Sequence, residues 1–188
     1  MGECNHAENS DPSGCAECPS SVLLVPAGAN AQCKRNTDCG ATDICVSGRC
    51  ESAFNRIYVV TVLRAKVSER TRDGANWDMA GGLPDPYVYV IFPDTNTRPR
   101  TIAKTITNTT EPVWNSTWEF MLKDTGQALY FCVADAAPSN PDDFHIAMTG
   151  KASCQGSKSA LELVRIGHLL WKTDGELKEL EVTVQLKQ

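Results

Sequence analysis

Seven of the nine cysteines lie within the first fifty residues, and no other feature of the sequence constrains the fold as strongly. The segment 1–52 contains only one apolar run, Val22–Val25, so it cannot bury enough surface to offset its chain entropy without cross-links. Dense cysteines in a short polar segment usually form disulfides, which persist in oxidising compartments. A zinc site is less favoured, because the Cys15-x-x-Cys18 pair has no second close pair after it. The seven are Cys4, Cys15, Cys18, Cys33, Cys39, Cys45 and Cys50.

The second half of this segment reads "CKRNTDCGATDICVSGRC" over residues 33–50, and it resembles the small cysteine knots of exported proteins, including some bacterial lipoproteins. Alternate cysteines often pair in such modules, so the resemblance implies the disulfides Cys33–Cys45 and Cys39–Cys50, although sequence alone does not fix connectivity. Cys4 has two open interpretations, a further disulfide with Cys15 or Cys18, or a lipidated cysteine exposed by leader cleavage. We therefore expect a protein that is secreted or anchored at the cell surface or outer membrane.

Charge and patterning divide the chain into two predicted units, a cysteine-rich disulfide module over residues 1–52 and a larger domain over residues 53–188. The first unit carries seven acids and three bases, which accounts for -4 of the net charge of -5. An acidic chain offers no basic field for nucleic acid, so no nucleic-acid partner is expected. No apolar run reaches the ~18 residues of a membrane span.

Residues 53–188 repeat short β-branched or aromatic runs separated by turn signals. This pattern predicts an all-β fold, an eight-stranded antiparallel sandwich in which alternate side chains face a shared core. One stretch, Ser159–Leu170, has a helical pattern instead. The expected strands are Ile57–Val67, Tyr87–Phe92, Arg100–Thr107, Trp114–Leu122, Ala128–Ala134, Phe144–Ala152 and Glu179–Leu186.

Three stretches in order along the chain resemble the C2 domain, the calcium-dependent lipid-binding domain of synaptotagmins and protein kinases C. They are "DMAGGLPDPYVYV" (78–90) with "IFPD" (91–94) closing its strand, "TNTTEPVWNSTWEF" (107–120) and "LYFCVADAAPSNPDDFHIA" (129–147). The resemblance implies a C2-like sandwich with calcium-binding loops at one end. It does not decide between the two circularly permuted topologies of that fold.

The resemblance also implies a set of calcium ligands, because Ca²⁺ takes about 6–8 oxygen ligands. One position departs from the pattern: Ala137 stands where the family has a bridging carboxylate, so we expect one weakly bound ion. The alternative is a structural loop, since aspartates commonly cap turns. The implied ligands are Asp78 and Asp85 in the first loop and Asp135 and Asp143 in the third, with Asp142 and the backbone carbonyls of Met79 and Ala136 as further candidates.

Membrane contact is the expected consequence of calcium binding. Met79 and Leu83 would form an apolar loop tip, while Arg98, Arg100 and Lys104 form a thin basic patch worth roughly 1 kcal/mol per residue near an anionic surface. The sequence thus predicts an exported monomeric C2-domain protein that binds calcium weakly and then an anionic phospholipid membrane. The alternative is a calcium-independent adhesion or scaffold module for a protein or glycan.

Two further features bear on function. The three histidines are far apart and no nucleophile or phosphate-binding motif occurs, so we do not expect an enzyme. Cys132 lies in a strand that reads as buried, and Cys154 follows the next expected strand. The two cysteines either bridge neighbouring strands, which we favour, or are a core thiol and a loop thiol.

Overall fold

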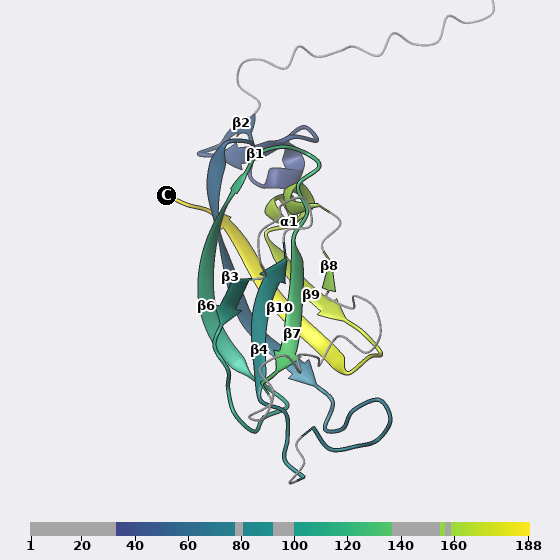
Figure 1. Cartoon of the computed structure of the whole chain (residues 1–188). Helices are drawn as coiled ribbons and strands as arrows, with labels where there is room; N and C mark the ends of the chain where they lie inside the picture. Colours follow the sequence, from purple (N-terminus) through teal and green to yellow (C-terminus); the bar gives the residue numbers. More distant parts are fainter. Residues whose placement is uncertain (1–32, 78–80, 92–99, 137–154, 157–158) are drawn as a thin grey trace, which may run out of the picture. The chain divides into compact units, whose positions relative to one another are not determined.

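The computed structural model of the chain describes residues 33–77, 81–91, 100–136, 155–156 and 159–188. Two four-stranded antiparallel sheets stack on each other in this part of the chain (Figure 1), which confirms the predicted all-β sandwich. The first sheet has the order β6-β3-β10-β9 and the second β5-β4-β7-β8. Their bounds are β3 (Arg56–Val67), β4 (Pro86–Ile91), β5 (Arg100–Ala103), β6 (Val113–Leu122), β7 (Tyr130–Asp135), β8 (Gln155–Gly156), β9 (His168–Lys172) and β10 (Leu177–Leu186).

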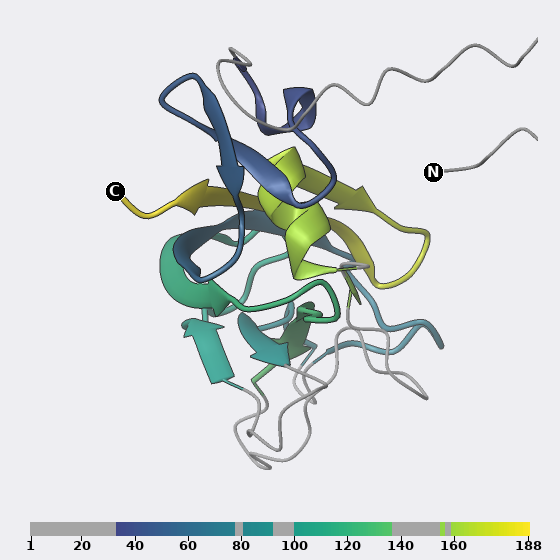
Figure 2. The same ribbon diagram turned by 90° about the horizontal axis from the view of Figure 1, so that it is seen from above.

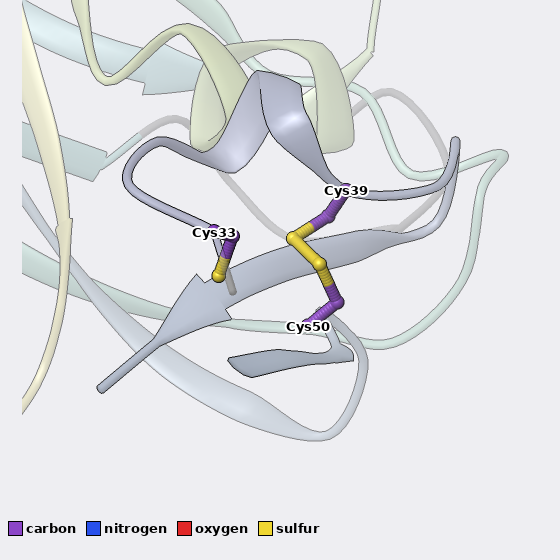
Figure 3. A group of neighbouring side chains, drawn as sticks. All are labelled: Cys33, Cys39 and Cys50. Carbon is purple, nitrogen blue, oxygen red and sulfur yellow. A yellow bond between two sulfur atoms is a disulfide. The ribbon is translucent and has the colours of Figure 1, made fainter. Parts of the chain in front are cut away.

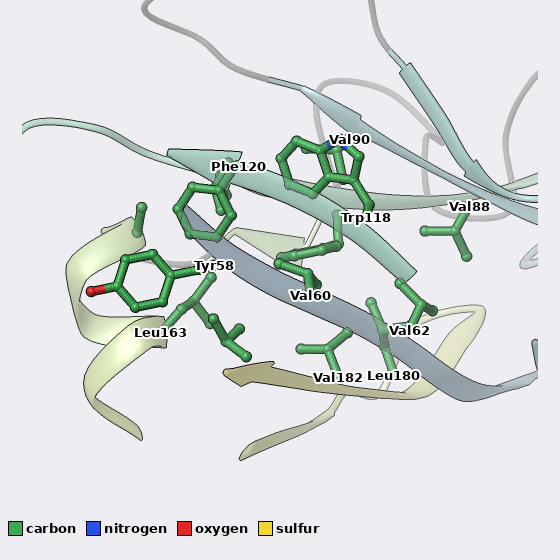
Figure 4. Close-up of a cluster of buried hydrophobic side chains, with 14 of the residues drawn as sticks. Tyr58, Val60, Val62, Val88, Val90, Trp118, Phe120, Leu163, Leu180 and Val182 are labelled. Atoms are coloured by element: carbon green, nitrogen blue, oxygen red, sulfur yellow. The ribbon is translucent and has the colours of Figure 1, made fainter. Parts of the chain in front are cut away.

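The core forms because alternate side chains of the strands point into the space between the sheets. On β3, Tyr58, Val60 and Val62 are buried, and Figure 4 shows them in the same cluster as Val88 and Val90 of β4. Removing one such aliphatic side chain from water contributes about 1.5–3 kcal/mol. The period of two in the sequence of β3 therefore fixes which face of the strand is inside.

The outer faces of the two sheets differ in chemistry. On the first sheet, Glu181 of β10 pairs with Arg64 of β3 (Nε–Oε2 2.6 Å) and with His168 of β9 (Nε2–Oε1 2.8 Å). On β4 and β7, the two central strands of the second sheet, four uncharged outward side chains are buried and form a separate small cluster. These two strands are thus buried on both faces, as the nearly unbroken apolar run of β7 indicates. The cluster consists of Tyr87, Tyr89, Cys132 and Ala134.

Strand β6 lies at the edge of the first sheet and contains a β-bulge. Its pairing with β3 shifts between Val62↔Ser116 and Arg64↔Val113, so two residues of β6 oppose one residue of β3. One of the two, Asn115, has φ = 50°, a left-handed conformation that asparagine tolerates better than most residues. The bulge bends the strand locally and increases its twist.

The helical prediction over Ser159–Leu170 was right only for its first half. Helix α1 spans Ala160–Ile166, and the Ser159 side chain accepts a hydrogen bond from the Glu162 N–H (3.0 Å) as its N-cap. Gly167 then adopts φ = 74°, which ends the helix, and the remaining residues form β9. Another expected strand, Phe144–Ala152, lies outside the described residues.

The described part of the cysteine-rich segment is a short 3-10 turn, η1 (Asn36–Asp38), followed by a hairpin of β1 (Asp43–Val46) and β2 (Arg49–Ser52). The sequence analysis did not predict the two hairpin strands. The expected disulfides are confirmed, Cys33–Cys45 with an S–S distance of 2.06 Å and Cys39–Cys50 with 2.10 Å. Figure 3 shows Cys39 joined to Cys50, with Cys33 beside them. The sulfur atoms of Cys33, Cys39 and Cys50 lie within 4.8 Å of one another, but each already belongs to a disulfide, which leaves none of them as a thiolate for zinc.

The hairpin is linked to α1 through η1, which contacts the helix at one end of the sandwich (Figure 2). Asn36 joins the two, because its Nδ2 donates to the Val164 carbonyl (2.9 Å) and its Oδ1 accepts from the Cys45 N–H (3.1 Å). Arg165 Nη2 also donates to the Cys39 carbonyl (3.2 Å), and Ile44 of β1 belongs to the main core. Residues 31–188 form one compact unit. The predicted domain boundary at residue 52 stays a prediction about which parts fold independently.

We predict that Asn36→Ala lowers the free energy of unfolding by about 1–2 kcal/mol, because two partly buried hydrogen bonds are lost. Urea unfolding of the oxidised protein measures the change. Thr37→Ala is the matched control, since Thr37 is the exposed neighbour in the same turn, and it should have little effect. Equal stability of the two variants would contradict the bridging role of Asn36.

Candidate functional site

The register of two central strands brings together two of the predicted ligands. Strands β4 and β7 pair antiparallel, with Pro86 opposite Asp135. Asp85 comes directly before β4, and Asp135 is the last residue of β7. The start of one antiparallel strand lies beside the end of its neighbour, so these two aspartates meet at one end of the second sheet.

Hydrogen bonds join the two aspartates directly. The Asp85 N–H donates to Asp135 Oδ1 (2.6 Å), and the Ala136 N–H donates to the Asp85 carbonyl (3.0 Å). Asp135 is only 6% exposed, and Asp85 is half-buried. A buried carboxylate is tolerated when hydrogen-bond donors satisfy it, and here a backbone amide of the partner loop does so.

A third segment adds Asn108, a residue that the sequence analysis did not select. Its N–H donates to Asp85 Oδ1 (2.6 Å), and its Oδ1 accepts from the Leu83 N–H (3.0 Å). Asn108 has φ = 57°, so the loop turns sharply beside Asp85. The available signal was an asparagine in a turn segment just before the "EPVW" stretch. We call the group Asp85, Asn108, Asp135 and Ala136 the acidic rim.

The oxygen atoms of the acidic rim are of the kinds that coordinate a hard cation. They are carboxylate, amide and backbone carbonyl oxygens, the ligand types that Ca²⁺ takes in proteins. Within the described part of the chain, Asp85 Oδ2 has no hydrogen-bond partner, which leaves this oxygen available as a ligand. The other predicted ligands, Asp78, Met79, Asp142 and Asp143, lie outside the described residues, as does Ala137. The full ligand set therefore stays a prediction.

Two buried tyrosines line the outer face of the second sheet next to the acidic rim. Burial raises the pKa of Tyr87 to about 12, and the nearby Tyr89 phenol and the Asp135 charge contribute to that rise in pKa. Burial also raises the pKa of Tyr89. Both tyrosine side chains are therefore neutral at physiological pH, so they add no negative charge to that of the acidic rim.

The residues predicted to touch a membrane fall into two groups. Leu83 is 36% exposed at the acidic rim, and Arg100 and Lys104 are exposed on and after β5. Met79 and Arg98 lie outside the described residues. The outward side chains of β4 and β7 are uncharged, so they add nothing to a basic surface. None of the described helices has the length and hydrophobicity needed to cross a membrane.

Comparison with known proteins identifies the fold. The family model described as "C2 domain" matches residues 56–167. The chain belongs to the C2-domain family. No curated protein matches the sequence of this C2 chain.

Solved structures agree on the fold. A C2 domain of a plant extended synaptotagmin 1 superposes with a TM-score of 0.50 at 23% identity, over 71% of this chain and 95% of that domain. A human GIVD cytosolic phospholipase A2, solved with an inhibitor and terbium chloride, superposes with a TM-score of 0.52 at 22% identity, over 73% of this chain. The matched region is only 18% of that phospholipase, so the likeness concerns the fold alone.

The structure answers the question of topology. There are two circularly permuted arrangements of the C2 fold. This C2 chain has the one in which β10, a neighbour of β3 in the first sheet, is the last strand of the domain. Strand β10 lies between β3 and β9 and pairs antiparallel with both. Both ends of the described domain consequently lie away from the acidic rim, since β10 ends beside the start of β3 (Leu186↔Tyr58).

We predict that Asp135→Ala lowers the free energy of unfolding by about 1–3 kcal/mol in calcium-free buffer, because the buried Asp85 N–H loses its acceptor. Asp135→Asn keeps an acceptor oxygen of the same shape and should cost less. Urea unfolding with a chelator present compares the two variants. Equal losses for Asn and Ala would show that the charge of Asp135, and not its hydrogen bond, stabilises the loop.

We also predict that the protein loses stability at alkaline pH through its buried tyrosines. The pKa values of Tyr58 and Tyr87 are raised from 10.0 to about 12, so folding favours their neutral form. Their contribution is complete below pH 10 and is lost as the pH rises through about 12. Urea unfolding over this range, with tyrosinate absorbance as the titration signal, measures the loss, and Tyr87→Phe should reduce it. Tyrosines that all titrate near pH 10 in the folded protein would contradict this assignment.

Proposed function

We propose that this protein is an exported C2-domain protein that binds calcium weakly at the acidic rim and then binds an anionic phospholipid membrane. The observation that carries the proposal is the contact between Asp85 and Asp135, which lie 50 residues apart in the sequence yet share a hydrogen bond. The C2 family is generally associated with calcium-dependent lipid binding, and this chain keeps acids in two of its loops.

Calcium has a clear electrostatic role in such a cluster. Neighbouring carboxylates repel one another, and a bound divalent cation reverses the sign of that interaction. Asp85, Asp135 and the Asn108 side chain would hold the ion together with acids of the neighbouring segments. Ala137 offers no side-chain oxygen, so we expect one ion with a Kd of about 10⁻⁴–10⁻³ M, the range of extracellular modules.

The ion would also supply most of the attraction to a membrane. Residues 53–188 hold sixteen acids and fifteen bases, so this unit alone has almost no net attraction to anionic lipid. Arg100 and Lys104 add roughly 1 kcal/mol each near such a surface. Calcium at the rim would bridge protein carboxylates to lipid phosphates, while exposed Leu83 provides apolar contact with the interface.

Export is the proposed setting because two disulfides close the described cysteine segment. Disulfides of this kind persist in oxidising compartments, and extracellular calcium concentrations suit a weak site. Secretion and anchoring at the cell surface both fit, and a lipid on Cys4 stays a prediction from the sequence.

A calcium-independent adhesion or scaffold role is the second candidate. The observation in its favour is that each carboxylate of the rim already accepts a backbone N–H, Asp135 from Asp85 and Asp85 from Asn108. Loops stabilised in this way hold their shape without a metal ion, and the domain would then act through a protein or glycan partner.

We predict that calcium at 100 times its Kd adds about 2.7 kcal/mol to the free energy of unfolding, measured as a rise in melting temperature. Asp85→Ala should abolish the rise, because the variant loses a proposed ligand. Asp124→Ala is the matched control, because Asp124 is an exposed acid just after the C-terminal end of β6. This variant should respond to calcium like the wild type.

Co-sedimentation with vesicles completes the test of the proposed function. Phosphatidylserine vesicles should pellet the wild type only when calcium is present, and phosphatidylcholine vesicles should not. Binding that is indifferent to calcium, with no change in melting temperature, would favour the adhesion or scaffold role instead.

A further inference from the structure

The hairpin of β1 and β2 covers one end of the sandwich core. It comes directly before β3, at the end of the two sheets that lies away from the acidic rim (Figure 1). Ile44 of β1 is only 2% exposed, Ala53 just after β2 is fully buried, and both belong to the main core. The hairpin therefore supplies apolar contacts that the two sheets do not supply at this end.

A buried tyrosine lies beneath the hairpin. The Tyr58 side chain is 1% exposed, and its O–H donates to the Ala53 carbonyl (2.8 Å). The Ala53 N–H in turn donates to the carbonyl of Thr42, the residue just before β1 (3.0 Å). Figure 4 shows Tyr58 beside Leu163 of α1 in the core cluster. A displaced hairpin would thus open the Tyr58 hydroxyl and this end of the core to water.

The hairpin is too short to keep its shape without cross-links. Strands β1 and β2 have four residues each, and an isolated two-stranded hairpin is at best marginally stable in water. Two disulfides hold it, Cys33–Cys45 and Cys39–Cys50. The redox state of these two bonds therefore controls how firmly the hairpin covers the core.

We propose that the disulfide-bonded hairpin is a redox-controlled lid on the core: a dithiol reductant loosens the hairpin and opens this end of the sandwich, while the acidic rim at the other end stays closed. The inference does not depend on calcium binding. Because the closed lid needs its disulfides, the fully closed domain would persist in an oxidising compartment and open in a reducing one.

The reaction is thiol–disulfide exchange with a dithiol. One thiolate of the dithiol attacks a hairpin sulfur, breaks its S–S bond and forms a mixed disulfide, and the second thiolate then attacks the reductant's own sulfur in that mixed disulfide. The hairpin is left with two thiols, and the reductant leaves as a disulfide after giving up two electrons and two protons. Cys45 and Cys50 are half-buried and Cys33 and Cys39 are buried, so attack is expected on the first two.

A serine variant tests the lid without a reductant. Cys39→Ser/Cys50→Ser removes one hairpin disulfide and leaves the other in place. A reductant would also act on Cys132, which is disulfide-bonded. Its expected partner Cys154 lies outside the described residues, so the predicted bridge between these two cysteines stays a prediction.

Amide hydrogen exchange of the serine variant locates the opening. The Ala53 and Asn55 N–H groups, both hydrogen-bonded beside the hairpin, should exchange at least about tenfold faster than in the wild type. The Asp85 and Ala136 N–H groups of the acidic rim should keep their wild-type rates. Unchanged exchange beside the hairpin, or equal acceleration at the rim, would overturn the lid.

A second variant opens the lid while both hairpin disulfides remain. Ile44→Ala removes the side chain that anchors β1 in the core, so it should accelerate exchange of the same Ala53 and Asn55 amides. Arg49→Ala is the matched control, because Arg49 is exposed on β2, and its exchange should equal that of the wild type. Wild-type exchange in Ile44→Ala would show that the hairpin does not close the core.

Tyrosinate absorbance gives an independent readout. Burial raises the pKa of Tyr58 to about 12, and the charge of Arg56 opposes part of that rise. In the serine variant the pKa of Tyr58 should fall toward 10.0, whereas the pKa of Tyr87 near the rim should remain at about 12. Tyr58→Phe identifies the transition that belongs to Tyr58. A Tyr58 that still titrates at about 12 in the serine variant would contradict the opening.

Reversibility tests the redox control itself. Wild-type protein treated with dithiothreitol should show fast exchange of the Ala53 and Asn55 amides, and reoxidation with an oxidised dithiol should restore slow exchange. Amides that stay slow in the reduced protein would overturn control of the lid by its disulfides.

Discussion

The antiparallel register of β4 and β7 is the constraint on which the rest of the molecule depends. With Val88 opposite Val133, both side chains enter the core, and the same register sets Pro86 opposite Asp135. A slip of one residue would turn every side chain of the strand to the other face and bury the wrong set. Because the core tolerates only one register, the position of Asp135 beside Asp85 follows from packing and requires no interaction between the carboxylates themselves.

Much of this was predictable from the sequence, for physical reasons that differ between elements. The alternation in "IYVVTVL" and the unbroken apolar run of β7 indicate strands because burial dominates their energetics. Cys33–Cys45 and Cys39–Cys50 were predictable only through the resemblance to small cysteine modules, in which alternate cysteines often pair, because sequence alone does not fix connectivity. Asp85 and Asp135 could be selected because their loops resemble the calcium-binding loops of C2 domains.

Other features depend on contacts that local patterns do not encode. The run Ser159–Leu170 favours a helix, but Gly167 ends it, and pairing with β10 turns the remainder into β9. Asn108 joins the acidic rim through its backbone N–H and a left-handed φ; an asparagine in a turn segment indicates the turn but not the contact with Asp85. The docking of the hairpin on α1 rests on Asn36 and Val164, which are 128 residues apart.

The bulge in β6 affects whether two copies of the domain can pair edge to edge. An open edge strand offers unpaired N–H and C=O groups on which another chain can add a strand, the first step of aggregation. At Asn115 the left-handed residue and the extra position break the regular spacing of those groups near one end of the edge. An irregular edge of this kind disfavours strand pairing between two copies of the domain.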